Sequence, residues 1–286
     1  ISSVPSLTPP AREPKTGEIK LATKALSKTY GGGGFLFRTG RTVHAARDVN
    51  IHVRRGETLG IVGESGSGKT TVARCIARLI APSEGEILID GDDWAGLGEA
   101  ALRPKRRHVQ IVFQDPYRSL NPRRTVGASV IEGPMNFGAG RTESLEKARE
   151  LMQLVGLSPD ALSRYPHQFS GGQRQRIAIA RALALEPEIL IADEAVSALD
   201  VSVQAQVLKL LDDVRQKFGL AVLFITHDLR VAAQICDRIA VMQHGVVVEE
   251  GATANVFADP RHEYTKALFA AAPGRDSGLG ATLVSA

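Results

Sequence analysis

The 286-residue sequence contains little cysteine and few aromatic residues: two cysteines, one tryptophan and 5% aromatic residues in all. Cys75 and Cys236 lie among apolar residues on predicted helices and lack metal-site spacing, so both are expected to be small core residues in a reducing compartment. No run of about 18 uncharged apolar residues occurs, so no segment is predicted to span a bilayer. The net charge of +4 is too small to argue for DNA binding, and it fits a nucleotide binder or a protein resting on an anionic membrane surface.

The strongest motif is a glycine-rich loop with the sequence GESGSGKTT, which matches the phosphate loop G-x-x-x-x-G-K-[ST]. A buried strand is predicted before it at residues 58–62, and a helix after it at residues 72–80. Glycines let the backbone curl so that N–H groups point inward, and the helix adds its positive N-terminal end. Lys69 is expected to reach the β and γ phosphates, and the Thr70 hydroxyl to bind Mg²⁺. The alternative, a flexible Gly/Ser loop, does not explain these flanks. The predicted nucleotide-binding residues here are Gly63, Glu64, Ser65, Gly66, Ser67, Gly68, Lys69, Thr70 and Thr71.

Apolar strands and amphipathic helices alternate along most of the chain. Residues 189–194 and 221–226 include uninterrupted apolar runs, which are typical of strands buried on both faces of a parallel sheet. A long helical stretch breaks the alternation and predicts an inserted helical subdomain at about 117–183. Nearer the start, residues 18–25 and 43–53 have the alternating pattern of half-buried strands. The predicted fold class is therefore α/β, with a mainly parallel central sheet.

Polar residues follow three of the predicted strands. Asp193 and Glu194 end one strand, Gln114 follows another, and His227 follows a third. The carboxyl ends of strands are where open α/β sheets bind ligands. Asp193 is placed to hold Mg²⁺, which prefers oxygen ligands, and Glu194 is placed to polarise an attacking water. Taken alone, two acids at a solvated strand end or a structural histidine would also fit.

Several motifs accompany the phosphate loop in a fixed order. They are Gln114, FSGGQR at 169–174, Asp193 with Glu194, SALD at 197–200, and His227. This order resembles the nucleotide-binding subunit of an ABC transporter over residues 18–272, and the Ser-Gly-Gly-Gln sequence is similar to that family's signature motif. The resemblance implies an ATPase with a P-loop NTPase fold, an antiparallel β subdomain near the N-terminus, and ATP and Mg²⁺ as cofactors.

The resemblance also implies roles and boundaries. Gln114 is expected to reach Mg²⁺ and the water, and His227 to contact the γ phosphate. Residues 1–17 are predicted to be a flexible segment or linker, 18–272 the ABC ATPase domain, and 273–286 a tail. The predicted catalytic residues are Glu194, His227, Gln114 and Lys69. The predicted metal ligands are Thr70, Gln114 and Asp193.

The signature motif precedes a predicted helix, so it offers a second helix N-terminus for an anion. The resemblance implies that this motif completes the ATP site of an opposing cassette, and that Asp200 belongs to the loop connecting the paired sites. Tyr30 matches the aromatic that stacks on adenine, although it, Phe35 and Phe37 in or beside the glycine run 31–34 could equally cover a sheet edge. The predicted signature residues are Ser170, Gly171, Gly172 and Gln173.

Three stretches, at 112–123, 200–206 and 260–265, are similar to the peptide importer branch of the family, which includes dipeptide, oligopeptide and nickel systems. One departure is Ala195-Val196, where the branch usually has Pro-Thr. The implied function is powering import of peptides or a related small solute from the cytoplasmic face of the cell inner membrane, as a peripheral subunit. The implied partners are transmembrane permease subunits, a solute-binding protein acting through the assembled transporter, and a second ABC ATPase domain. That second domain could be an identical copy, a paralogue or a fused half, and the proline-bearing start suits the second half of a fusion.

Two other functions are compatible with parts of the sequence. A soluble ABC ATPase acting on nucleic acid or ribosomes could use the basic cluster of Arg103, Lys105, Arg106 and Arg107, although such a cluster is more often a solvated edge, and no nucleic-acid partner is expected. A regulatory module with a degenerate site is disfavoured because every residue with assigned chemistry is intact.

Overall fold

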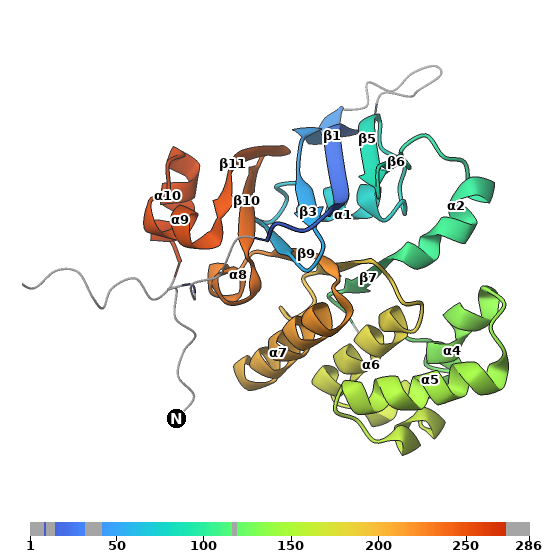
Figure 1. Ribbon diagram of the computed structural model, residues 1–286. Coiled ribbons are helices and arrows are strands. Elements are labelled where there is room, and N and C mark those ends of the chain that lie inside the picture. Colours follow the sequence, from blue (N-terminus) through green and yellow to red (C-terminus); the bar gives the residue numbers. More distant parts are fainter. Residues whose placement is uncertain (1–8, 10–14, 32–41, 116–118, 273–286) are drawn as a thin grey trace, which may run out of the picture.

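The computed structural model describes residues 9, 15–31, 42–115 and 119–272 (Figure 1). Most of the predicted flexible segment at 1–17, most of the glycine run with Phe35 and Phe37, and the tail at 273–286 lie outside the described residues. No helix in the described part of the chain is long and apolar enough to cross a bilayer.

Two β-sheets form the frame of the described part of the chain. The first has five strands in the order β2-β1-β5-β6, with β3 also pairing β1, and all of its pairings are antiparallel. The second has six strands in the order β11-β10-β4-β9-β8-β7, parallel except for β11. The α/β class with an antiparallel sheet near the N-terminus is thereby confirmed. The strands are β1 Ile19–Tyr30, β2 Val43–Val49, β3 His52–Arg54, β4 Thr58–Val62, β5 Glu84–Ile89, β6 Asp92–Asp93, β7 Val109–Phe113, β8 Ile189–Asp193, β9 Ala221–Thr226, β10 Arg238–Gln243 and β11 Val246–Ala252.

Figure 1 shows where several of the helices lie relative to the two sheets. Helices α4, α5 and α6 lie together at the lower right and come from the chain between β7 and β8, α1 lies near the first sheet, and α9 with α10 lies at the upper left beside β11. The helices are α1 Lys69–Ile76, α2 Glu99–Lys105, α4 Val126–Asn136, α5 Arg141–Leu154, α6 Gly171–Leu183, α7 Val201–Phe218, α8 Leu229–Ile235, α9 Thr253–Ala258 and α10 Glu263–Ala270, with 3-10 turns η1 Arg106–His108, η2 Pro159–Ser163 and η3 Pro166–Gln168.

The central sheet is buried on both faces because its strands are apolar throughout. In β8, Ile189 and Ile191 pack into one hydrophobic cluster with the antiparallel sheet and α1. The alternate residues Leu190 and Ala192 pack into a second cluster with the helices on the other face. A strand that buries both faces needs apolar residues at every position, which explains why these runs do not alternate with polar residues.

The register of the parallel strands brings their carboxyl ends to one edge. Val62 pairs with Thr226, while Asp193 pairs with both Ile225 and Phe113. The phosphate loop, His227, Glu194 and Gln114 each follow one of these strand ends directly, so the fold gathers all four along the same edge of the sheet.

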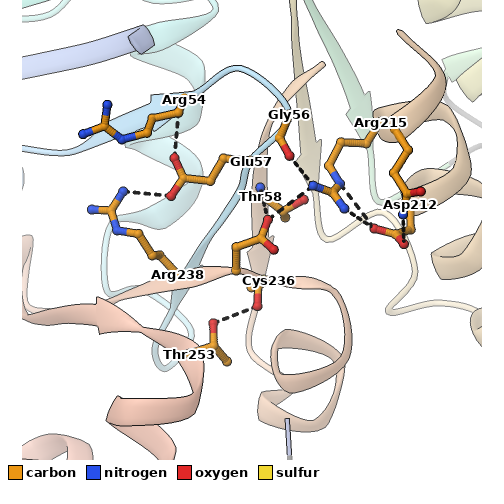
Figure 2. Close-up of polar contacts among 11 residues, drawn as sticks. Arg54, Gly56, Glu57, Thr58, Asp212, Arg215, Cys236, Arg238 and Thr253 are labelled. Atoms are coloured by element: carbon orange, nitrogen blue, oxygen red, sulfur yellow. Dashed lines mark hydrogen bonds and ion pairs between the residues drawn. The ribbon is translucent and has the colours of Figure 1, made fainter. Parts of the chain in front are cut away.

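A charged network fixes the opposite, amino-terminal edge of the sheet (Figure 2). The Arg215 guanidinium, on α7, donates to the carbonyl of Gly56, to Asp212 at 2.7 Å and to Asp237 at 3.4 Å. Asp237 also accepts the backbone N–H of Thr58 at 2.8 Å, at the first residue of β4. The network therefore anchors the strand that leads into the phosphate loop.

Two local predictions were wrong. The helix predicted at 72–80 ends at Ile76, because Arg78 adopts a left-handed φ of 52° and the N–H groups of Leu79 and Ile80 turn back to the carbonyl of Arg74. Cys236 was expected on a helix, but it directly follows α8 in extended conformation, and it is buried.

Candidate active site

The phosphate loop adopts backbone angles that side-chain-bearing residues resist. Gly63, Gly66 and Gly68 have φ of 150°, 81° and 104°. A Cβ at Gly63 would lie 2.2 Å from the carbonyl oxygen of Met242, and one at Gly68 would lie 2.1 Å from that of Ala45. Gly68 caps α1, so the loop delivers its N–H groups to a helix N-terminus, as an anion site requires.

Lys69 is 4% exposed, and its ammonium is held inside the loop. It donates to the carbonyls of Gly63 at 2.8 Å and Glu64 at 2.7 Å, and to the Ser67 hydroxyl at 3.3 Å. Burial lowers the pKa of Lys69, an effect that the nearby carboxylates of Glu194 and Asp193 partly oppose. Among the described residues no carboxylate pairs directly with this ammonium, so it is well placed to pair with an anionic ligand.

Thr70 and Asp193 form a pair of oxygen donors beside the loop. The Thr70 hydroxyl donates to Asp193 Oδ1 at 3.0 Å, and Asp193 is 5% exposed. Burial raises the pKa of Asp193, with the Thr70 hydrogen bond opposing the shift and the charge of Glu194 adding to it. Mg²⁺ is usually held by one or two protein oxygens together with water and substrate phosphates, so this donor set fits Mg²⁺.

Glu194 and His227 lie together at the ends of β8 and β9. Glu194 Oε1 is 3.3 Å from His227 Nδ1, and the two side chains are 21% and 54% exposed. Glu194 has a left-handed φ of 51°, and its N–H bonds to the carbonyl of Ile225 at 3.0 Å. Unusual backbone angles in non-glycine residues concentrate at functional sites, where the surrounding structure holds them in place.

The Ala195-Val196 departure leaves this turn intact. Both side chains are buried, at 1% and 2% exposed, and pack in the hydrophobic cluster with the helices. The carbonyl of Glu194 accepts the N–H of Ser197 at 3.1 Å and its hydroxyl at 3.0 Å. Apolar residues at these two positions are therefore compatible with the placement of the acid.

Gln114 and Tyr30 are exposed in the structure. Gln114 follows β7, the strand next to β8, which places it on the same edge as Glu194. Tyr30 is the last residue of β1 and is 43% exposed, with the ammonium of Lys28 5.2 Å from the centroid of its ring. Neither placement tests its predicted role, so Mg²⁺ contact by Gln114 and adenine stacking by Tyr30 stay predictions.

The signature motif is built as a helix cap. The Ser170 hydroxyl accepts the N–H of Gln173 at 3.3 Å, and the Gln173 side chain accepts the N–H of Ser170 at 3.0 Å. Gly172 faces α7 so closely that a Cβ there would lie 2.2 Å from Val203. Asp200 caps α7 by accepting the N–H of Val203 at 3.0 Å.

The signature motif does not lie at the phosphate loop of its own chain. Figure 1 shows α6, which it begins, in a part of the molecule separate from α1. The structure thus gathers the phosphate loop, Asp193, Glu194, His227 and Gln114 along one edge, whereas the first turns of α6 pack toward the end of β7, where the Gln175 amide donates to the carbonyl of Phe113 at 3.4 Å.

The basic cluster next to β7 is partly neutralised. Lys105 pairs with Asp92 at 2.9 Å, and Arg106 pairs with Glu99 at 2.8 Å. Pairs of this kind are ordinary solvated ion pairs. They reduce the charge available for a nucleic-acid phosphate.

One contact at the loop had no functional signal in the sequence. The Tyr264 hydroxyl, on α10, accepts the N–H of Glu64 at 3.1 Å. The two residues are 200 positions apart, so only the folded chain reveals their contact.

The sequence model of the family described as "ABC transporter" matches residues 46–197, more than half of the chain. The chain belongs to the ABC transporter family. It is an ATP-binding subunit of the family that hydrolyses ATP, which confirms the resemblance in the sequence.

Similar proteins support this assignment along most of the chain. The chain is 50% identical over 236 residues to the "Putative peptide import ATP-binding protein BOV_A0347" of Brucella ovis, and the match covers 82% of this chain and 74% of that protein. It is 52% identical over 258 residues to the "Probable peptide ABC transporter ATP-binding protein y4tS" of Sinorhizobium fredii, covering 90% and 73%. It is 49% identical over 244 residues to the glutathione import ATP-binding protein GsiA of Salmonella paratyphi A, covering 85% of this chain and 39% of GsiA.

Solved structures confirm the fold of the ABC subunit. The dimeric ATP-binding cassette MJ0796, in a post-hydrolysis state bound to ADP and Pi, superimposes with a TM-score of 0.71 at 32% identity, covering 82% of this chain and 98% of that one. The ADP conformation of the cassette MJ1267 superimposes with a TM-score of 0.73 at 23% identity, covering 88% and 99%, and shares the fold.

Proposed function

We propose that this ABC subunit hydrolyses magnesium-bound ATP at the edge where β4, β7, β8 and β9 end, and that it thereby powers import of peptides or a related small solute. The observation that carries the proposal is the convergence at that edge of a buried lysine, an oxygen-donor pair and a carboxylate with its histidine. The solute class follows from relatives at about 50% identity whose names specify peptide or glutathione import.

Binding rests on the phosphate loop. Backbone N–H groups at the start of α1 would face the phosphates, and Lys69 would exchange its loop carbonyls for the β and γ phosphate oxygens. Pairing a buried ammonium with an anion offsets the cost of its burial, which favours phosphate binding at this loop. Tyr30 would stack on adenine from the end of β1.

Thr70, Asp193 and Gln114 would hold Mg²⁺ through their side-chain oxygens, directly or through water. The ion supplies neutralisation of phosphate charge when bound. Asp193 is the best placed of the three to bind the ion. Burial has already reduced the hydration of its carboxyl group, and a bound cation would favour the charged form of that group.

Hydrolysis would use the carboxylate of Glu194 to orient and polarise a water in line with the γ phosphate. A positioned base of this kind typically contributes about 10² to 10⁴ in rate. His227, already within hydrogen-bond distance of Glu194, would contact the γ phosphate with its exposed ring. The remaining requirement is alignment, which the parallel strand ends supply.

A second cassette would complete the site. Ser170, Gly171, Gly172 and Gln173 form the N-terminus of α6, a helix separate from α1 in Figure 1, which suits a role on the nucleotide of an opposing cassette. Asp200, capping the helix that packs against Gly172, would connect the two sites. The second cassette could be identical, a paralogue or fused in one chain.

The partners follow from the same proposal. The subunit would act peripherally at the cytoplasmic face of the inner membrane, bound to transmembrane permease subunits that receive solute from a solute-binding protein. Residues 18–272 would form the ATPase domain, with the helices within 117–183 as its inserted subdomain.

Reconstitution tests the proposal. The subunit is assembled with its permease in proteoliposomes, and phosphate release is measured with and without a peptide-loaded binding protein. We expect peptide to stimulate hydrolysis and Lys69→Ala to abolish it. Stimulation by nucleic acid or ribosomes in place of peptide would contradict the proposal.

A further inference from the structure

Helix α10 contacts Glu64, the second residue of the phosphate loop. The hydroxyl of Tyr264, in the first turn of α10, accepts the backbone N–H of Glu64 at 3.1 Å. Tyr264 is half-buried, and its ring packs against the hydrophobic cluster that covers the helical face of the central sheet. The hydroxyl is therefore presented to the loop by a ring that is itself held in place.

The peptide group on the other side of Glu64 is held from inside the loop. Its carbonyl accepts the Lys69 ammonium at 2.7 Å and the N–H of Ser67 at 3.2 Å. When Lys69 turns to phosphate, as the proposed function requires, the carbonyl loses its charged donor. The contact from Tyr264 does not involve Lys69, so it can persist through that exchange and keep the start of the loop in position.

The beginning of α10 is anchored to the same sheet as the loop. One oxygen of the Glu249 carboxylate accepts the N–H of Arg261 at 2.8 Å, and the other accepts the N–H of His262 at 3.0 Å. Glu249 lies on β11 opposite Val241, which pairs in turn with Val62, the residue before the loop. The carboxylate thus fixes α10 at the height of the sheet where the loop begins.

Two further contacts limit the freedom of α10. His262 caps the helix, with its Nδ1 accepting the N–H of Tyr264 at 3.1 Å. At the other end, Phe269 is 3% exposed and lies against Phe257 with ring centroids 4.6 Å apart. A helix fixed at both ends can hold a hydroxyl at one place more firmly than a free side chain could.

We propose that Tyr264 is a positioning residue of the nucleotide site, which holds the start of the phosphate loop in its binding conformation, and that Glu249 sets its position by anchoring α10. The inference rests on the proposed function, because it assigns the loop to nucleotide. It also gives a physical role to the 260–265 stretch, which the sequence offers only as a family likeness.

The test is Tyr264→Phe, which removes one hydroxyl and leaves the ring packing. A neutral hydrogen bond contributes modestly, so we expect the Kd of ATP and of ADP, measured by calorimetry, to rise about three- to fivefold. The KM for ATP should rise by the same factor and kcat should change by less than about twofold, since the loop is loosened and the groups around the water are not. Lys266→Ala is the matched control: it removes an exposed side chain from the same helix and should leave Kd unchanged.

Glu249→Ala tests the anchor. We expect a similar rise in Kd, and we expect Tyr264→Phe to add little in the Glu249→Ala background, because both act through the same contact. A fall in the unfolding temperature with unchanged Kd would show a merely structural role and overturn the proposal. If the wild type binds ATP and Tyr264→Phe binds it with the same Kd, the proposal about Tyr264 is overturned and the proposed function is not. Failure of the wild type to bind ATP would overturn both.

Discussion

Replacing Gly68 with alanine would place a methyl carbon 2.1 Å from the carbonyl oxygen of Ala45. Contacts of a Cβ below 3.0 Å essentially do not occur in proteins, so the loop or β2 must move by about 1 Å. Gly68 also has a φ of 104°, which costs an alanine roughly 1–3 kcal/mol. The movement falls on the first turn of α1, where the N–H groups proposed to face the phosphates begin.

Gly66→Ala is the matched control for the backbone term. Gly66 has a φ of 81°, but none of the described protein atoms beyond its chain neighbours would lie within 4 Å of a Cβ at this position. Backbone strain alone, at roughly 1–2 kcal/mol, would weaken ATP binding about five- to thirtyfold if all of it were expressed in the bound state. A 1 Å displacement of groups that must align can cost an enzyme about 10²-fold in rate, and we expect a loss of similar size when the displaced groups are the N–H donors to phosphate.

Calorimetry with ATP should therefore rank the proteins as wild type, then Gly66→Ala, then Gly68→Ala, with the last beyond about 10²-fold weaker than the wild type. Thermal unfolding without nucleotide checks that each variant is folded. Binding by Gly68→Ala within tenfold of the wild type, or weaker binding by Gly66→Ala than by Gly68→Ala, would show that the close approach of Gly68 to Ala45 does not control ATP binding.

Three further outcomes follow from buried groups. Arg215→Ala removes the guanidinium, 4% exposed, that pairs with the Asp237 carboxylate, 6% exposed. Breaking such a pair costs about 3–5 kcal/mol, so the unfolding temperature should fall by about 10 °C, and a decrease of less than about 2 °C would contradict the network's role. Burial raises the pKa of Cys75 to about 11, and Cys236 is also buried, so mass spectrometry should find neither thiol alkylated in the native protein and both alkylated after denaturation. Burial lowers the pKa of Lys69, so in a fraction of the molecules Lys69 is neutral at alkaline pH, and binding of phosphate should restore its proton. Calorimetry of ATP binding at alkaline pH, in buffers of different ionisation enthalpy, should therefore show proton uptake, and a binding enthalpy independent of the buffer would contradict this.

Much of the fold and the nucleotide edge could be predicted because the relevant signals are local. A run such as 221–226 must be buried on both faces, and a polar residue directly after it must lie at a strand end. The parallel register then brings Glu194 and His227 together without any further information.

The features that could not be predicted depend on distant partners. Arg215 and Asp237 read as ordinary surface charges in the sequence, and only packing buries them against each other. Tyr264 meets Glu64 across 200 positions. The early end of α1 depends on a left-handed Arg78, a conformation with no signature in a non-glycine residue.

The departure at Ala195-Val196 shows the converse. The sequence marks it only as a departure from the Pro-Thr that is usual in the branch. Burial of both side chains and the intact hydrogen bonds from Ser197 to Glu194 show that apolar packing supports the same turn.

The role of Glu194 in hydrolysis is tested by phosphate release from Glu194→Gln, measured together with the Kd of this variant for ATP. The amide keeps the shape of the side chain and loses the charge that would polarise the water. We expect ATP binding within about threefold of the wild type and hydrolysis slowed by about 10² to 10⁴. Hydrolysis by Glu194→Gln at the wild-type rate would contradict this role.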